Sequence, residues 1–162
     1  MTGRPQTYNG PLEAGVRAVA VLTAIFPQAL DLHWLTMLDY LLTHTGELGG
    51  PENIHPPSPI QAPATEVRRK LVQKALMLMM TRDLVTREVS ANGIRYAAGD
   101  SAVPFLDGLR SPYMVAIKER AVWLAEHLGE FSNAKLDAFA STSFDRWVAE
   151  FQAIEQSLGG DA

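Results

Sequence analysis

The clearest pattern of hydrophobic and polar positions in the chain lies between Thr65 and Ala98. Apolar residues first recur at intervals of three and four, which predicts a helix over 65–84 that lies within the core. From residue 85 the period changes to two, and Asn92-Gly93 interrupts it with the residues that supply two positive φ angles to a tight hairpin turn. The stretch therefore predicts a helix followed by a β-hairpin over 85–98. The apolar helix positions are Val67, Leu71, Val72, Ala75, Leu76, Leu78, Met79 and Met80.

Helical periods and capping signals predict further helices on both sides of this stretch. Prolines stand in the first turn of two of them, at Pro11 and Pro112, and Gly129 follows the longest. The predicted helices cover about residues 11–26, 32–43, 101–109, 112–128, 132–139 and 143–158. A mostly helical chain in which a helix runs into an amphipathic hairpin is typical of a winged helix-turn-helix, with the hairpin as its wing.

The predicted fold is therefore mainly α and forms one domain. We expect a disordered N-terminus over 1–7, a winged-helix core over 8–100, and additional C-terminal helices over 101–158 as part of the same domain. A stretch over 45–64 contains eight glycines and prolines and interrupts the core. A winged helix ordinarily has a short turn there, so this Pro/Gly-rich insertion either packs on its own domain or binds something else.

Composition restricts the class of protein. Of the 162 residues 47% are hydrophobic, enough for a real core, and none is cysteine. Disulfides, thiolate metal sites and a cysteine nucleophile are therefore excluded, which fits a reducing cytosol. The sequence contains neither a signal peptide nor an apolar run long enough to span a membrane. We expect a soluble, cytoplasmic protein.

Charge is distributed unevenly along the chain. The net charge is −4, yet residues 65–96 hold seven basic and three acidic residues, so this stretch is +4 and the remainder −8. The basic side chains fall at the start of the predicted helix and beside the wing tip, where they could contact DNA phosphates. These candidate nucleic-acid-binding residues are Arg68, Arg69, Lys70, Lys74, Arg87 and Arg95. Gln73 is the best placed base reader, so non-specific backbone contact is favoured, and a merely solvated face is the alternative.

Motifs of catalysis are missing from the sequence. It contains no phosphate-binding GxxxxGK(S/T) loop, no GxGxxG after a strand, no HExxH and no GxSxG. The four histidines, His33, His44, His55 and His127, do not share metal-ligand spacing on one helix, and carboxylate pairs have the spacing of solvated helix faces. We expect neither an enzyme nor a metal or cofactor site.

Four segments carry a resemblance to a known family. They read YNGPLEAGVRA over 8–18, LDYLLTHTG over 38–46, GGPENIHPP over 49–57 and LMMTRDLV over 78–85. Together they resemble the middle component of bacterial ABC-three-component systems, which overlap with Lamassu-type antiphage defence. The likeness covers about residues 8–151, and the insertion is its most specific part. It implies a small non-enzymatic subunit that sits with an SMC-like coiled-coil ATPase and an effector, commonly a nuclease, and holds or releases that effector when foreign DNA is sensed.

A winged helix needs neither the insertion nor the C-terminal helices with Trp123 and Trp147, so we expect these two regions to supply most of the contact with the ATPase and the effector. Trp34 and Trp123 fall off the main apolar faces of their helices, so each either covers a small internal cluster or anchors an interface. The candidate partner-binding residues are Ile54, His55, Pro56, Pro57, Trp123 and Trp147. Two other functions stay open: a winged-helix transcription regulator that binds a palindromic site as a homodimer, and an unrecognised enzyme.

Overall fold

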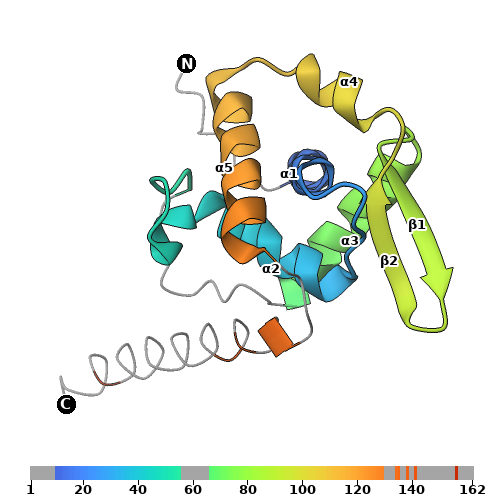
Figure 1. Ribbon diagram of the computed structural model, residues 1–162, viewed down its shortest axis with the longest axis horizontal. Coiled ribbons are helices and arrows are strands. Elements are labelled where there is room, and N and C mark those ends of the chain that lie inside the picture. The colour runs from blue at the N-terminus through green and yellow to red at the C-terminus, as the bar shows by residue number, and fades with distance from the viewer. Residues whose placement is uncertain are drawn as a thin grey trace.

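The computed structural model describes residues 10–55 and 66–129, together with Ala134, Lys135, Ala138, Ser141 and Gln156. Its elements follow in the order α1 (Pro11–Ala24), α2 (Leu32–Thr43), a 3-10 helix η1 (Thr45–Leu48), α3 (Glu66–Met80), β1 (Val85–Ser90), β2 (Gly93–Ala98), α4 (Ala102–Asp107) and α5 (Pro112–Leu128). The described part of the chain is thus helical except for a two-stranded antiparallel hairpin, which confirms the mainly α prediction (Figure 1).

Local capping chemistry sets the helix boundaries close to where the sequence predicted them. The carboxylate of Asp31 accepts a hydrogen bond from the Trp34 amide at 2.9 Å and so starts α2. The Ser111 hydroxyl accepts from the Met114 amide in the same way at the start of α5, and Gly129 ends that helix with a positive φ of 65°. The boundaries of these helices are therefore set by capping residues close in sequence.

Helix α1 lies at the centre of the core. It packs against α2, α3 and α5, and Figure 1 shows it end-on with α5 and α3 on either side. Val19 and Leu22 on α1 are completely buried, as are Leu42 on α2 and Ile117 on α5. The core thus joins elements from both halves of the chain, so α5 belongs to the same packed unit as the hairpin.

Helix α3 differs from its prediction in two ways. It ends at Met80, because Asp83 adopts a left-handed φ of 58° and turns the chain into β1, whereas the prediction continued to Leu84. It also lies on the core rather than within it, since Val67 is 80% exposed and Met77 61% exposed. The buried row is the narrower one formed by Val72, Ala75, Leu76 and Met79. The expectation that this helix lies within the core was wrong.

The hairpin forms as predicted, but its turn lies one residue earlier. Ser90 pairs with Gly93, so the two turn residues are Ala91 and Asn92. The Ser90 hydroxyl accepts from the Asn92 amide at 3.2 Å, and Gly93 adopts a positive φ of 105° at the first position of β2. Glycine is needed there, while Asn92 is not a positive-φ residue, so the prediction of two such angles was wrong.

A short bridge attaches the hairpin to the helices. Leu30, just before α2, exchanges two backbone hydrogen bonds with Tyr96 on β2, at 2.8 and 2.7 Å. The outer edge of β2 is therefore paired at Tyr96, and the hairpin is held against α1 and α2. This bridge was not predicted from the sequence.

Several predictions lie outside the described residues. They concern the N-terminus over 1–7, Pro56, Pro57, Trp147, and, apart from isolated positions, the helices at 132–139 and 143–158. Within the described ranges, no helix has the length and apolar character needed to cross a membrane.

Candidate functional site

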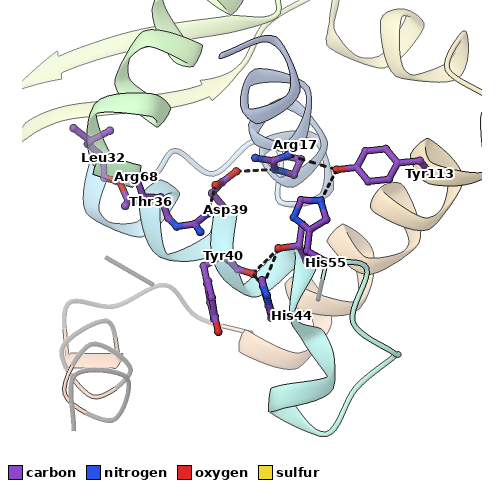
Figure 2. A network of polar contacts seen from close by, with 10 residues as sticks. Arg17, Leu32, Thr36, Asp39, Tyr40, His44, His55, Arg68 and Tyr113 are labelled. Carbon is purple, nitrogen blue, oxygen red and sulfur yellow. Dashed lines mark hydrogen bonds and ion pairs between the residues drawn. The ribbon is translucent and has the colours of Figure 1, made fainter. Parts of the chain in front are cut away.

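A buried ion-pair cluster joins the first three helices. Asp39 on α2 accepts a hydrogen bond from Nε of Arg17 on α1 at 2.8 Å through one oxygen, and from Nη1 of Arg68 on α3 at 2.6 Å through the other (Figure 2). Arg17 is 1% exposed and Asp39 5%. Charge-assisted bonds of this length are strong in a dry setting, so one carboxylate fixes three helices relative to one another.

Arg17 extends the cluster to α5. Its Nη1 donates to the Tyr113 hydroxyl oxygen at 3.4 Å, and that hydroxyl lies 3.2 Å from Nε2 of His55. Burial alone would lower the pKa of Arg17, but the charge of Asp39 and the hydrogen bond to it outweigh burial, so the pKa is raised. Arg17 is therefore a permanent cation that also orients Tyr113.

The pKa of His55 shifts in the opposite direction to that of Arg17. Burial, followed by the positive charge of Arg17 nearby, lowers the pKa of His55 from 6.5 to about 4. The ring is therefore neutral at pH 7. Because Arg17 donates to the Tyr113 oxygen, the Tyr113 hydroxyl hydrogen can be donated to His55 Nε2, and Figure 2 shows these three side chains converging from α1, α5 and the insertion.

This shift predicts acid sensitivity. Below pH 6.5 the unfolded chain takes up a proton at His55, whereas the folded chain does so only near pH 4. Protonation therefore favours the unfolded state, and the free energy of unfolding, unaffected above pH 6.5, decreases as the pH falls toward 4. The full shift corresponds to about 3.4 kcal/mol, and solvent screening of the half-buried ring reduces the expected loss to about 1–2 kcal/mol. Urea unfolding between pH 7 and 4.5 should show this extra loss in the wild type relative to His55→Gln. Parallel pH curves for the two proteins would contradict the prediction.

A second group of rings surrounds the end of α2. His44, 1% exposed, stacks on Tyr40 with ring centroids 4.1 Å apart, and its Nδ1 lies 2.9 Å from the Tyr40 carbonyl oxygen. The Arg68 guanidinium lies over the Tyr40 ring, 5.4 Å from its centroid. His44 is the C-cap residue of α2, and it is buried there rather than exposed to solvent.

The first half of the insertion is hydrogen-bonded to its own domain. The backbone amides of Ile54 and His55 both donate to the Thr43 carbonyl oxygen, at 2.9 and 3.2 Å. Arg120 on α5 donates twice to the Glu52 carbonyl oxygen, at 3.2 and 2.8 Å. These contacts hold 45–55 between the end of α2 and one side of α5.

Trp123 completes this attachment. Its indole lies so close to Gly50 that a side chain at that position would collide with the ring. The indole also stacks on the His127 ring, with ring centroids 4.6 Å apart and nearly parallel planes. Trp34, the other off-face tryptophan, is 2% exposed. For both residues the structure favours the internal-cluster alternative.

The six candidate basic residues separate into three groups. Arg68 is directed inward to Asp39 and its side chain is 11% exposed, whereas Arg69, Lys70 and Lys74 are exposed on the outer side of α3. On the hairpin, Arg87 is paired with Tyr96 and Arg95 with Glu88. Adjacent register positions face opposite sides of a hairpin, so Arg87 and Arg95 lie on opposite faces. The sequence had treated all six as one surface.

An apolar groove was not predicted from the sequence. It has a volume of about 470 Å³ and lies where the ends of α1, α3 and α4 meet. Its lining consists of Leu12, Leu78, Met79, Arg82, Leu84, Ser101 and Phe105. Two of its residues, Leu12 and Leu78, are 56% and 37% exposed. Among the residues that the structure describes, no group of three His, Cys, Asp or Glu side chains is placed to hold a metal ion.

Comparison with known proteins gives one match. Residues 7–150 match the family model described as ABC-three component (ABC-3C) system Middle Component 2. The chain belongs to this family. No curated protein and no solved structure matches it. Membership makes the chain a middle component, which implies interaction with the other components of its system.

The predicted partner-binding residues that the structure describes make contacts within the domain itself. Ile54 packs against the core and His55 bonds to Tyr113, so their visible contacts are internal. Trp123 is partly buried, and Pro56, Pro57 and Trp147 lie outside the described residues. The role of these residues in partner binding stays a prediction, and the structure adds that Ile54, His55 and Trp123 also hold the insertion in place.

Proposed function

We propose that this chain is a non-enzymatic bridging subunit of a Lamassu-type antiphage complex. It links an SMC-like coiled-coil ATPase to an effector, commonly a nuclease, and acts in the cytoplasm. The match to the middle-component family over residues 7–150 carries the proposal, because a middle component works with the other parts of its system. The resemblance in the four sequence segments supports the SMC-like and effector partners.

The exposed apolar residues also support a bridging role. Large hydrophobic side chains that remain exposed in the described residues are distributed over α1, α3, the hairpin, α4 and α5. Examples are Leu12 at 56%, Val89 at 72%, Val103 at 54% and Val122 at 50% exposure. Apolar residues exposed singly are normal on a protein surface, but Leu12 and Leu78 also line the apolar groove between α1, α3 and α4. A contiguous apolar surface of this kind favours contact with another protein.

We infer a winged-helix arrangement for the core of this subunit. The support is the order of elements, in which α1, the bridging Leu30, α2, α3 and the hairpin follow one another, and Leu30 pairs with the outer strand of the hairpin. The insertion stands where a short turn is expected between α2 and α3, and its described part, 45–55, is attached to the end of α2 and to α5, beside the packed helices rather than between them.

The bridging proposal is tested by co-expression of the three components with an affinity tag on the ATPase. We expect the effector to co-purify with the ATPase when this chain is present, and its recovery to fall at least about tenfold when the chain is omitted, equivalent to about 1.4 kcal/mol of binding free energy. A matched control expresses an unrelated helical protein in its place. Undiminished recovery of the effector without this chain would overturn the bridging role.

The basic outer side of α3 beside a hairpin favours a second candidate function, a winged-helix transcription regulator. That function expects a stable homodimer and a palindromic site whose half-sites lie about 34–36 Å apart. Light scattering of the purified chain, combined with selection from random duplexes, separates the candidates. A monomer that enriches no sequence would exclude the regulator and leave the bridging proposal in place.

A further inference from the structure

The basic residues of α3 lie in two different environments. Arg68 is engaged with the buried Asp39, whereas Arg69, Lys70 and Lys74 are exposed, and no ion pair to them is present among the described side chains. We propose that Arg69, Lys70 and Lys74 bind the phosphate backbone of double-stranded DNA without reading its base sequence. This inference goes beyond the bridging role and does not depend on it.

The spacing of these residues matches a phosphate backbone. Positions 70 and 74 are about one helical turn apart and share a face, whereas position 69 lies about 100° around the helix from position 70, so the three cations spread over the exposed side of α3. From Arg69 to Lys74 the helix rises about 7.5 Å, and a DNA strand presents a phosphate about every 3.4 Å of duplex axis. The extent of the patch along α3 is therefore comparable to the distance between phosphates two steps apart on one strand.

The local charge also favours an anionic partner. Glu66, the first residue of α3, is exposed and lies three and four positions before Arg69 and Lys70, but no acidic residue follows it before Asp83, so the exposed side of α3 beyond its first turn carries only positive charge. The nearest buried carboxylate, Asp39, is bonded to both Arg17 and Arg68 and its side chain is 4% exposed. Its negative charge is more than balanced by two guanidinium groups and does not counteract the patch.

The shape of the element favours DNA over duplex RNA. A helix with its side chains is about 10–12 Å across and fits the B-form major groove, which is about 12 Å wide, whereas the A-form major groove is narrow and deep. Polar base readers are scarce, since Gln73 is accompanied on the exposed side by Val67 and Met77. We therefore expect α3 to contact DNA without discriminating between base sequences.

The test measures binding of two unrelated duplexes of equal length by fluorescence anisotropy at 50 to 200 mM salt, a range over which phosphate contacts change affinity strongly. Wild type is compared with Arg69→Ala/Lys70→Ala/Lys74→Ala, both as the full chain alone and within the assembled complex. We expect the variant to bind both duplexes more weakly by a similar factor, with a salt slope reduced by about 2 to 3 units. Because the three side chains are exposed, the unfolding midpoint should not change.

Single variants supply the matched control. Lys74→Ala and Arg110→Ala each remove one exposed positive charge, and Arg110 follows α4, away from the patch. Only Lys74→Ala should reduce the salt slope, by about 0.9 units. Equal effects of the two variants would show general charge attraction and overturn the proposal.

Other results would overturn it as well. No duplex binding by either the wild-type chain or the complex excludes the site, and loss of affinity for one duplex only indicates base reading instead. If the triple variant keeps its duplex affinity but no longer recovers the ATPase or effector, the patch binds an acidic protein surface. That last outcome would leave the bridging role standing, so the two proposals fail separately.

Discussion

Asp39→Asn is expected to lower the free energy of unfolding by about 3–5 kcal/mol, more than any other substitution proposed for this chain. The amide keeps the shape of the side chain but removes the charge that balances Arg17 and Arg68. Arg17 is 1% exposed and cannot recover its hydration in the folded state. The substitution therefore leaves an uncompensated cation among α1, α2 and α5.

Urea unfolding followed by circular dichroism at pH 7 measures this loss. Asp107→Asn is the matched control, because Asp107 is an exposed carboxylate at the end of α4, and its effect should stay within about 0.5 kcal/mol. Adding Arg17→Met to Asp39→Asn should cost less than Arg17→Met costs in the wild type, since the two side chains are directly bonded. Additive losses would show that the two residues contribute independently.

The sequence was informative wherever structure depends on near neighbours. Asp31 and Ser111 cap α2 and α5 through residues three positions ahead, and Gly129 ends α5 through its own conformation. Alternation over 85–98 likewise predicted a hairpin, because side-chain direction in a strand has a period of two. Its turn was placed one residue late, since an Asn-Gly pair is compatible with more than one turn type.

The ion-pair cluster depends on contacts that no local pattern contains. Arg17, Asp39 and Tyr113 are brought together by the packing of α1, α2 and α5, across up to 96 residues of sequence. One signal was present, because Arg17 and Asp39 each interrupt strongly apolar stretches and carry opposite charges. A lone charge within a buried face needs a partner, and this pair could have been proposed on that basis.

Helix α3 shows how the choice of a face changes a functional prediction. Arg68 shares a helical row with Val72, Ala75 and Met79, which is the row that the structure buries. The wider face chosen from the sequence included Val67 and Leu78, so Arg68 was grouped with the exposed Arg69 and Lys70. A narrower apolar face, limited to the row of Val72, Ala75 and Met79, predicts that Arg68 points inward and that Arg69 and Lys70 point outward.

Gly99→Ala is expected to give the second largest loss of stability, roughly 1–3 kcal/mol, because it introduces a side chain where two backbone segments meet. A Cβ at this position would overlap the Asp83 carbonyl oxygen and lie 2.8 Å from its carbon. The Gly99 amide also donates to the Leu84 carbonyl oxygen at 3.0 Å, so the segments before β1 and after β2 cannot easily separate. The hairpin would have to shift relative to α3.

Gly15→Ala is the matched control for Gly99→Ala, since its added Cβ would also be crowded, 2.7 Å from the Met79 Cε. There the crowding atoms, Met79 Cε and Cγ at 2.7 and 2.8 Å, belong to a side chain that can change rotamer rather than to backbone, and alanine in a helix interior gains about 0.5–1 kcal/mol over glycine. Gly15→Ala should therefore cost less than Gly99→Ala. Urea midpoints compare the variants, and hydrogen exchange should show lost protection of β1 and β2 only in Gly99→Ala. Equal stability of the two variants would mean that the backbone around Asp83 moves as readily as a methionine side chain. The close contact at Gly99 would then not fix the position of the hairpin beside α3.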